Sequence, residues 1–346
     1  VERTVCEPAG FEEFRIEESD STPGGVPVML PDLAPCPECL EEMHNPSSRR
    51  YHYPFTNCTH CGPRYSIIET MPYDRAGTSM KGFRMCPECR REYQDVEDRR
   101  FHAQPIGCPS CGPSVKVLFS DGSGLGFGHG FDTPAAQAAW VLADGLIVAL
   151  LGVGGFQLLA DASSEAAVRR LRRLKERDAK PFAVMVPDVA AAERLCRLSE
   201  EERRLLASPA APIVLARGRK DVDLAPSVCM FSRFVGIMLP SSPLHALLMD
   251  VWGRPLVVTS GNLSGEPLCI SVEEGLEKLG HVADVFLVHD RPVVRPVDDS
   301  VVRVTDGRAM MVRRARGYAP RPVWRTSAAA PDVLALGAGL KNTICW

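Results

Sequence analysis

Apolar and polar residues alternate with two different periods in the longer, C-terminal part of the chain. Short apolar runs, typical of buried strands, alternate with segments whose apolar residues recur every three or four positions, typical of helices. The strand-like runs are GLIVALL, PFAVMV, PIVLA, VGIML, PLVVTS and DVFLVH. Helices are predicted at SSEAAVRRLRRLKER, EEERRLLAS and PLHALLMDVW and after Ser271. Together these segments predict an α/β (α+β) domain built on a mixed, twisted sheet.

Hydroxyl residues mark the predicted helix starts. Ser163 is the predicted N-cap of the first helix. Ser199 with Glu202, and Ser271 with Glu274, have the spacing of a capping motif. The segment SVVRVTDGRAMMVRRA predicts a hairpin that turns at its Asp-Gly pair.

Before this domain the pattern is dominated by cysteine. Eight of the 13 cysteines form four CxxC pairs, separated by eighteen residues within each repeat and by twenty-four between the repeats. A glycine-proline turn follows each second pair. This arrangement predicts two structural zinc sites, because four thiolates leave no coordination position open; a redox dithiol or a disulfide framework is the less favoured alternative. The predicted ligands are Cys36, Cys39, Cys58, Cys61, Cys86, Cys89, Cys108 and Cys111.

The pairing of these cysteines stays open at this point. Self-contained repeats are the simpler arrangement and the one we favour, but a site shared between the repeats satisfies the same spacing. His52 and His102 occupy equivalent places in the two repeats. Since four thiolates fill each site, we expect the two imidazoles to pack beside the metal rather than bind it.

Composition limits the possible classes of protein. The length of 346 residues predicts two or three domains, and 45% hydrophobic residues suffice for sizeable cores. The net charge of -3 gives no indication of a nucleic-acid partner. The longest apolar run, 146–160, is too short to span a bilayer, and the N-terminus has no signal-like segment. A cytoplasmic protein with no membrane partner is predicted. The glycine-rich stretch at 114–130 is interpreted as a linker.

Two clusters of polar residues in the larger domain suit anion binding. Lys175, Arg177 and Lys180 stand where a helix gives way to a strand, and such cations can clamp a polyphosphate. A solvated basic helix face is the alternative. In VVTSGNLSGEP, a buried strand ends in hydroxyl and amide groups beside a glycine, which suits phosphate or nucleotide binding. A polar turn is the alternative there. This second cluster comprises Thr259, Ser260 and Asn262.

A third cluster follows near the end of the domain. Asp298 and Asp299 are candidate Mg²⁺ ligands, or they merely begin a strand. The nearby arginines of RRARGY are anion ligands or solvated charge. The GVGGF glycines fit neither GxGxxG nor a Walker loop, so we interpret them as a tight turn that lines a cleft.

Taken together, these motifs resemble one family. The two CPEC…CGP repeats closely resemble the zinc fingers of the HypF family, the carbamoyltransferases of [NiFe]-hydrogenase maturation. The stretches KERDAKPFAVM, TSGNLSGEP, DDSVVR and RRARGYAPRPV resemble the family's YrdC-like domain, whose signature of KxR followed by SxN falls on Lys175, Arg177, Ser260 and Asn262.

The resemblance implies a division of the chain into parts. It implies a linker after an acylphosphatase-like domain (1–33), zinc finger 1 (34–64), zinc finger 2 (84–114) and a YrdC-like nucleotide-binding domain (131–323). It also implies a linker and the first strand of a truncated kinase-like transferase domain (324–346).

The resemblance also implies a chemistry. Carbamate derived from carbamoyl phosphate attacks the α-phosphate of ATP, which gives carbamoyl-AMP and pyrophosphate. The carbamoyl group then passes to the C-terminal cysteine of the HypE protein. Lys175 and Arg177 would be catalytic and would hold the triphosphate and the carbamate, with Mg²⁺ bridging the phosphates. The other implied ligands of the nucleotide are Lys180, Thr259, Ser260, Asn262, Asp299, Ser300, Arg314 and Arg316.

Two residues depart from the family pattern, and two other functions compete with this one. Leu151 stands where the family commonly has lysine, and Gln157 where it commonly has histidine. These changes favour a slower enzyme, the use of a neighbouring cation, or another acyl substrate. One alternative is an acyl-adenylate synthase of the threonylcarbamoyl-AMP type, which shares KxR and SxN but is not expected to carry the cysteine array. The other is a zinc-dependent RNA-binding module, for which RRYHYPF is the only suitably basic and aromatic stretch.

Overall fold

The larger domain is organised by a single sheet. The computed structural model describes residues 29–125, 133–322, 335–336 and 344–345. Its strands are β1 (Val115–Phe119), β2 (Val148–Leu151), β3 (Phe156–Asp161), β4 (Ala183–Met185), β5 (Cys196–Arg197), β6 (Ile213–Gly218), β7 (Phe234–Met238), β8 (Leu256–Ser260), β9 (Val285–His289), β10 (Val301–Thr305) and β11 (Arg308–Arg313).

These strands form an 11-stranded sheet in the order β1-β9-β2-β3-β8-β4-β7-β6-β10-β11, with β5 paired to β6. The pairs β2–β9, β4–β7 and β6–β10 are parallel, and the other pairs are antiparallel. The predicted mixed sheet is confirmed. β10 and β11 form the predicted hairpin, whose turn residues Asp306 and Gly307 both have positive φ angles of 49° and 70°.

The helices begin at the expected kinds of residue. They are α1 (Pro37–His44), α2 (Pro87–Gln94), α3 (Pro134–Ala143), α4 (Glu165–Leu174), α5 (Val189–Leu195), α6 (Glu200–Leu206), α7 (Pro226–Cys229), α8 (Pro243–Trp252) and α9 (Val272–Leu279), with short 3-10 turns η1 (Arg75–Gly77) and η2 (Ser79–Gly82). Ser199 and Glu202 form the predicted capping box, and Ser271 caps α9. The predicted cap of α4 is wrong by one residue. Ser164 accepts from the backbone N–H of Ala167, whereas the Ser163 hydroxyl donates to Asp161.

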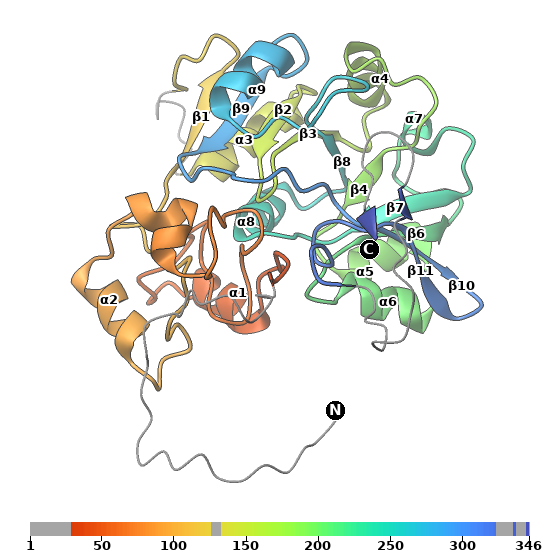
Figure 1. Cartoon of the computed structure of the whole chain (residues 1–346). Coiled ribbons are helices and arrows are strands. Elements are labelled where there is room, and N and C mark those ends of the chain that lie inside the picture. Colours follow the sequence, from red (N-terminus) through yellow and green to blue (C-terminus); the bar gives the residue numbers. More distant parts are fainter. Residues whose placement is uncertain (1–28, 126–132, 323–334, 337–343, 346) are drawn as a thin grey trace.

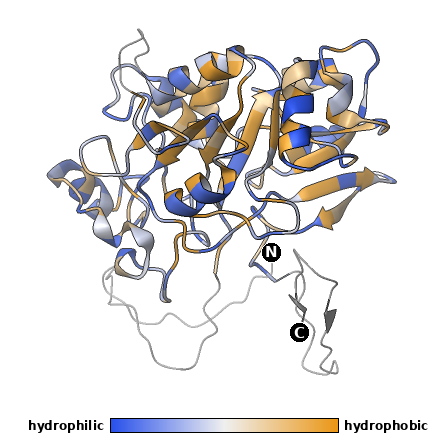
Figure 2. Cartoon of the chain, turned by 90° about the horizontal axis from the view of Figure 1, so that it is seen from above, coloured by the Kyte–Doolittle hydropathy of each residue, from blue (hydrophilic) through white to orange (hydrophobic). Residues whose placement is uncertain are grey.

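The sheet is covered on both faces. Because side chains alternate along a strand, Ile147, Ala149 and Leu151 face one core cluster while Val148 and Leu150 face the other. Helices α4, α5, α6 and α9 contribute to the first cluster, and α3 and α8 contribute to the second. Figure 2 shows the same segregation, with hydrophobic residues concentrated in the strands and on the inner faces of the helices. Each face of the sheet therefore has its own core.

One local interpretation needs correction, and helix α3 was missed. The segment 114–130 is not a linker throughout, since β1 lies within it and pairs antiparallel with β9 along five residues. Gly122 follows β1 and lies in the turn after it, where it has a φ of 81° and its backbone N–H donates to the carbonyl of Phe119. Helix α3 was not predicted from the sequence, because its alanine-rich segment has a weak apolar period.

The fingers pack against the sheet domain beside α8 (Figure 1). Met43 of α1 is fully buried against Ala135, Ala246 and Leu247. The backbone N–H of Ala34 donates to the carbonyl of Pro209 at 2.8 Å. In the part of the chain that the structure describes, no helix has the length and apolarity required to cross a membrane.

Only a small piece of the C-terminal stretch is described. Ala335–Leu336 (β12) and Ile344–Cys345 (β13) pair antiparallel. Most of the predicted N-terminal linker lies outside the described residues, as do residues 131–132 at the start of the predicted YrdC-like domain.

Candidate functional site

The eight predicted zinc ligands gather into two clusters, one in each repeat. In both clusters the four Sγ atoms lie within 4.8 Å of one another. In the first cluster, sulfur-to-sulfur distances of 3.6 Å (Cys36–Cys58), 3.6 Å (Cys39–Cys61) and 3.8 Å (Cys58–Cys61) are found. In the second cluster the corresponding distances are 3.8, 3.5 and 3.7 Å. A tetrahedral ion with Zn–S bonds of about 2.3 Å separates its sulfurs by about 3.8 Å. Both clusters therefore fit zinc, and each is formed within one repeat.

Local geometry explains how each cluster forms. Cys36 and Cys86 are the N-caps of α1 and α2, and a proline occupies the first turn of each helix. This arrangement lets the second cysteine of each CPEC motif lie one helical turn from the first. His52 and His102 are not members of either cluster. Both take the left-handed conformation, with φ of 53° and 52°, and their backbone N–H groups donate to Met43 and Tyr93.

The KxR motif forms one wall of a cavity of about 460 Å³. Lys175 is the C-cap of α4 and is only 4% exposed. Glu176, between the two cations, has a φ of 49°, a strained conformation of the kind that gathers at functional sites. This kink lets the chain present Lys175 and Arg177 to the same cavity.

Lys175 joins this wall to the SxN motif. Its Nζ donates to the backbone carbonyls of Ser260 and Asn262 at 2.5 and 2.6 Å, and lies 3.2 Å from Oδ1 of Asn262. The Ser260 hydroxyl donates to the same Oδ1 at 2.7 Å, and the Asn262 amide donates to the carbonyl of Glu266. The structure thus brings the KxR motif and the SxN motif together, although the two motifs lie more than eighty positions apart in the sequence.

Arg177 lies between this cavity and a second hollow of about 680 Å³. Its guanidinium contacts the Thr259 hydroxyl at 3.3 Å and the carbonyl of Pro181 at 2.6 Å, and lies over the ring of Phe182. Burial, together with the charges of Arg172 and Arg313, lowers its pKa to about 10. An anion bound here would relieve that repulsion. Residues shared by the two hollows are Arg177, Lys180 and Ser260.

The remaining predicted ligands are placed less directly. Asp299 and Arg314 line the second hollow. Ser300 is fully buried; its hydroxyl donates to the carbonyl of Arg316 and accepts from the backbone N–H of Ala315. Arg316 is 3% exposed and bonds to Asp299 and to the carbonyls at 210 and 211. Ser300 and Arg316 therefore hold this segment together from within.

The two aspartates suit a magnesium ion poorly as they are placed. Asp298 pairs with Arg313 at 2.9 Å. Asp299 accepts from Arg316 on one oxygen and from Gln157 on the other, at 2.9 and 2.7 Å. Although burial opposes it, the Arg316 guanidinium lowers the pKa of Asp299. Its carboxylate is thus ionised but already neutralised by the protein.

A buried polar chain lies beneath the GVGGF turn. Gln157 donates to Asp299, and its Oε1 lies 2.8 Å from Nε2 of His245. His245 Nδ1 lies 3.3 Å from the Ser241 hydroxyl. Burial lowers the pKa of His245 to about 4, so the imidazole is neutral. The sequence singled out Gln157 but not His245, whose only signal is a polar residue within an apolar helix. Leu151 is 2% exposed and lies in the core at the end of β2.

A YrdC-like sheet domain behind two four-cysteine fingers is the class that this fold and these sites define. The family model of the HypF finger matches residues 36–68 and 85–118. A second model, for the Sua5, YciO and YrdC proteins, described as telomere recombination, matches residues 140–315. The chain therefore belongs to the Sua5/YciO/YrdC family and carries HypF-type fingers.

Known proteins match nearly the whole chain. Carbamoyltransferase HypF of Synechocystis sp. is 48% identical over 338 residues, which are 96% of this chain and 43% of that protein. A crystal structure of full-length HypF in its phosphate- and nucleotide-bound form is 49% identical with a TM-score of 0.82, and the match covers 87% of this chain and 39% of that one. The chain thus spans less than half the length of these relatives. They confirm the predicted resemblance to HypF and the prediction of an enzyme family.

A weaker match covers the sheet domain alone. Threonylcarbamoyl-AMP synthase of Mus musculus is 35% identical over 159 residues, 44% of this chain and 55% of that protein.

Proposed function

We propose that the sheet domain forms carbamoyl-AMP from carbamate and ATP, as one step of a carbamoyltransferase reaction in [NiFe]-hydrogenase maturation. The observation that carries the proposal is the convergence of Lys175, Arg177, Ser260 and Asn262 on one cavity, which continues into a second hollow of the same size class. Together these hollows have room for a nucleotide, since ligand sites commonly measure about 300–1,000 Å³.

The proposed reaction is a displacement at phosphorus. A carbamate oxygen attacks the α-phosphorus of ATP, the bond from that phosphorus to the bridging oxygen of the β-phosphate breaks, and pyrophosphate leaves. Such a step requires positioning and charge neutralisation rather than covalent help from the protein. Arg177 and Lys180, which line both hollows, would neutralise the phosphates. Ser260 and Asn262 would accept or donate hydrogen bonds at the nucleotide.

In this proposal Lys175 holds the two walls of the cavity together. Its three contacts with the SxN segment fix the spacing between the two walls of the cavity. Magnesium would be held mainly by the phosphates themselves, because Asp298 and Asp299 are already paired with arginines. Ser300 and Arg316 would act by supporting the wall rather than by touching the nucleotide.

The later steps belong to a longer protein. We propose that carbamoyl phosphate is the source of carbamate and that the carbamoyl group passes to the C-terminal cysteine of a HypE partner, with AMP as the leaving group. The name carbamoyltransferase and the phosphate- and nucleotide-bound form of the related structure support carbamoyl transfer and the use of a nucleotide. The predicted division at 1–33, 34–64, 84–114, 131–323 and 324–346 remains part of the proposal. A cytoplasmic location is part of the proposal as well.

The alternatives have specific points for and against them. A threonylcarbamoyl-AMP synthase shares the sheet domain, but the fingers match the HypF model. An RNA-binding module would need the basic stretch RRYHYPF to be available. Arg49 and Arg50, its two arginines, are instead paired with Glu92.

The nucleotide site is tested by calorimetric titration with ATP and magnesium. Arg177→Ala removes at least one charge-assisted hydrogen bond, worth about 1.5–3 kcal/mol, so the affinity should fall about 10- to 100-fold. Arg169→Ala is the matched control, since this side chain lies on α4, the helix that ends just before the KxR motif, and is 73% exposed. Equal ATP affinity in the two variants would remove Arg177 from the site.

A further inference from the structure

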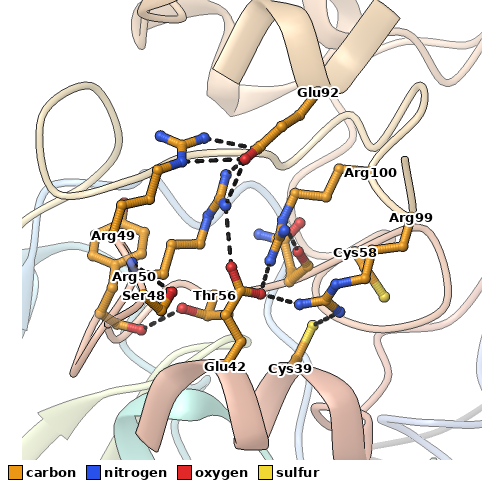
Figure 3. Close-up of polar contacts among 12 residues, drawn as sticks. Cys39, Glu42, Ser48, Arg49, Arg50, Thr56, Cys58, Glu92, Arg99 and Arg100 are labelled. Carbon is orange, nitrogen blue, oxygen red and sulfur yellow. Dashed lines mark hydrogen bonds and ion pairs between the residues drawn. The ribbon is translucent and has the colours of Figure 1, made fainter. Parts of the chain in front are cut away.

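Each finger provides two arginines that bind to the other finger, and these two sets of contacts form a reciprocal exchange. Arg49 and Arg50 belong to finger 1, but both bind Glu92 in finger 2, at 2.7 and 2.5 Å (Figure 3). Nη2 of Arg49 also donates to Sγ of Cys89 at 3.3 Å, and Nε of Arg50 donates to the carbonyl of Gly107 at 2.9 Å. The acceptors are thus Glu92, the metal-site cysteine Cys89 and the carbonyl of Gly107, and all three belong to finger 2.

The reverse exchange has the same form. Arg99 and Arg100 of finger 2 both bind Glu42 in finger 1. Nη1 of Arg99 donates to Sγ of Cys39 at 3.0 Å, and Nε of Arg100 donates to the carbonyl of Asn57 at 2.9 Å. Every element of one exchange has its counterpart fifty residues away in the other: Arg49 and Arg99, Arg50 and Arg100, Glu92 and Glu42, Cys89 and Cys39, Gly107 and Asn57.

We infer that Arg49 and Arg99 are outer-sphere partners of the metal site in the opposite finger, so that the two four-cysteine sites bind metal as one coupled unit. Neither finger completes its own metal environment. This explains why the repeat occurs twice, because one copy alone would lack the guanidinium that faces its thiolates.

The charges of the metal site support this inference. Four thiolates and one Zn²⁺ leave each site with a net charge of about -2. A buried charge of this kind requires hydrogen-bonded, oppositely charged neighbours. Cys39 is 1% exposed and Cys89 is fully buried, so solvent cannot supply them. The N–H groups of Arg99 and Arg49 point at these sulfurs.

The buried arginines keep the donors in place. Arg50 and Arg100 are 1% and 4% exposed, and each bonds both to the glutamate and to a carbonyl of the opposite finger. Glu42 and Glu92 lie on α1 and α2, the same helices that carry Cys39 and Cys89. The position of each donor relative to the sulfur is therefore fixed by the helix that holds the metal ligand.

The test is a metal-release experiment on the whole chain. Both sites are loaded with zinc, and its transfer to an excess of a chromogenic chelator is followed over time. Arg99→Leu should accelerate release from the site of finger 1, which contains Cys39, by about 10- to 100-fold, as expected when an outer-sphere partner is lost. Arg99→Lys keeps the charge and should show a smaller effect. Arg90→Leu, at an exposed position on α2, is the matched control.

Cadmium-113 NMR identifies which site responds. The two resonances of the cadmium-loaded chain are assigned with Cys58→Ser, which removes a finger 1 ligand. The inference predicts that Arg99→Leu shifts the finger 1 resonance and that Arg49→Leu shifts the finger 2 resonance. If each variant affects only the site of its own finger, or if release matches that of Arg90→Leu, the inference is wrong. Arg99→Lys gives the same decision if Arg99→Leu does not fold.

Discussion

Gln157 offers the clearest test of the polar chain under the candidate site. Its amide connects Asp299, on the wall of the second hollow, with the neutral imidazole of His245. Because the Gln157 carbonyl oxygen can only accept, Nε2 of His245 carries the proton. Both of these partners are more than nine-tenths buried. Gln157→Leu therefore removes two hydrogen bonds and leaves one carboxylate oxygen and one N–H group without partners.

The expected cost follows from these two groups. An unsatisfied buried polar group costs about 1–3 kcal/mol, so the substitution should lower the free energy of unfolding by about 2–6 kcal/mol. For a domain of this size, 1 kcal/mol corresponds to about 2–4 °C in the melting temperature. The transition of the sheet domain should thus move down by at least about 4 °C.

Scanning calorimetry of the chain measures this shift. Gln94→Leu, at an exposed position on α2, is the matched control and should leave the sheet-domain transition unchanged. A Gln157→Leu variant that melts within a degree of the control would show that these two buried groups do not depend on Gln157. It would mean that Asp299 and His245 find other partners or that water reaches them.

Three further outcomes are expected. Cys58→Ser should reduce the zinc content from two ions to one per chain, measured by elemental analysis; retention of both would contradict the ligand assignment. Gly275→Ala should destabilise the domain in thermal unfolding despite the better helix propensity of alanine, because the added Cβ would lie 2.4 Å from a ring carbon of Phe156. An unchanged melting temperature would show that α9 can shift. Burial lowers the pKa of His245 to about 4 and that of His289 to about 3. Below about pH 6.5 the unfolded chain therefore binds more protons than the folded chain, and the free energy of unfolding should fall as the pH decreases from there toward pH 4. A melting temperature independent of pH between 7 and 5 would be inconsistent with two neutral, buried imidazoles.

Local features of the fold were predictable from the sequence. The capping box at Ser199 and the Asp306-Gly307 turn depend on residues within four positions of each other. Apolar runs identified most of the strands for the same reason. The N-cap of α4 was misassigned by one residue because two adjacent serines have equal propensity, and only the bond from Ser163 to Asp161 distinguishes them.

Long-range contacts were the part that local patterns could not supply. The pattern named Lys175 and Ser260, but their contact spans 85 positions and depends on the pairing of β3 with β8 and the course of α4. Equally, nothing in the local pattern of RRYHYPF indicates that its arginines bind a glutamate in the other repeat. Asp299 and Arg316 were expected as nucleotide ligands from the resemblance, and the structure pairs them with each other.

Phosphorus NMR tests directly whether the sheet domain adenylates carbamate. The chain is mixed with ATP and magnesium, and carbamate is supplied both from carbamoyl phosphate and directly from ammonium bicarbonate. We expect pyrophosphate together with a carbamoyl-AMP or AMP signal, and the loss of both products in Arg177→Ala but not in Arg169→Ala. If ATP at saturating concentration yields no pyrophosphate, or yields ADP and phosphate instead, the proposed reaction is contradicted.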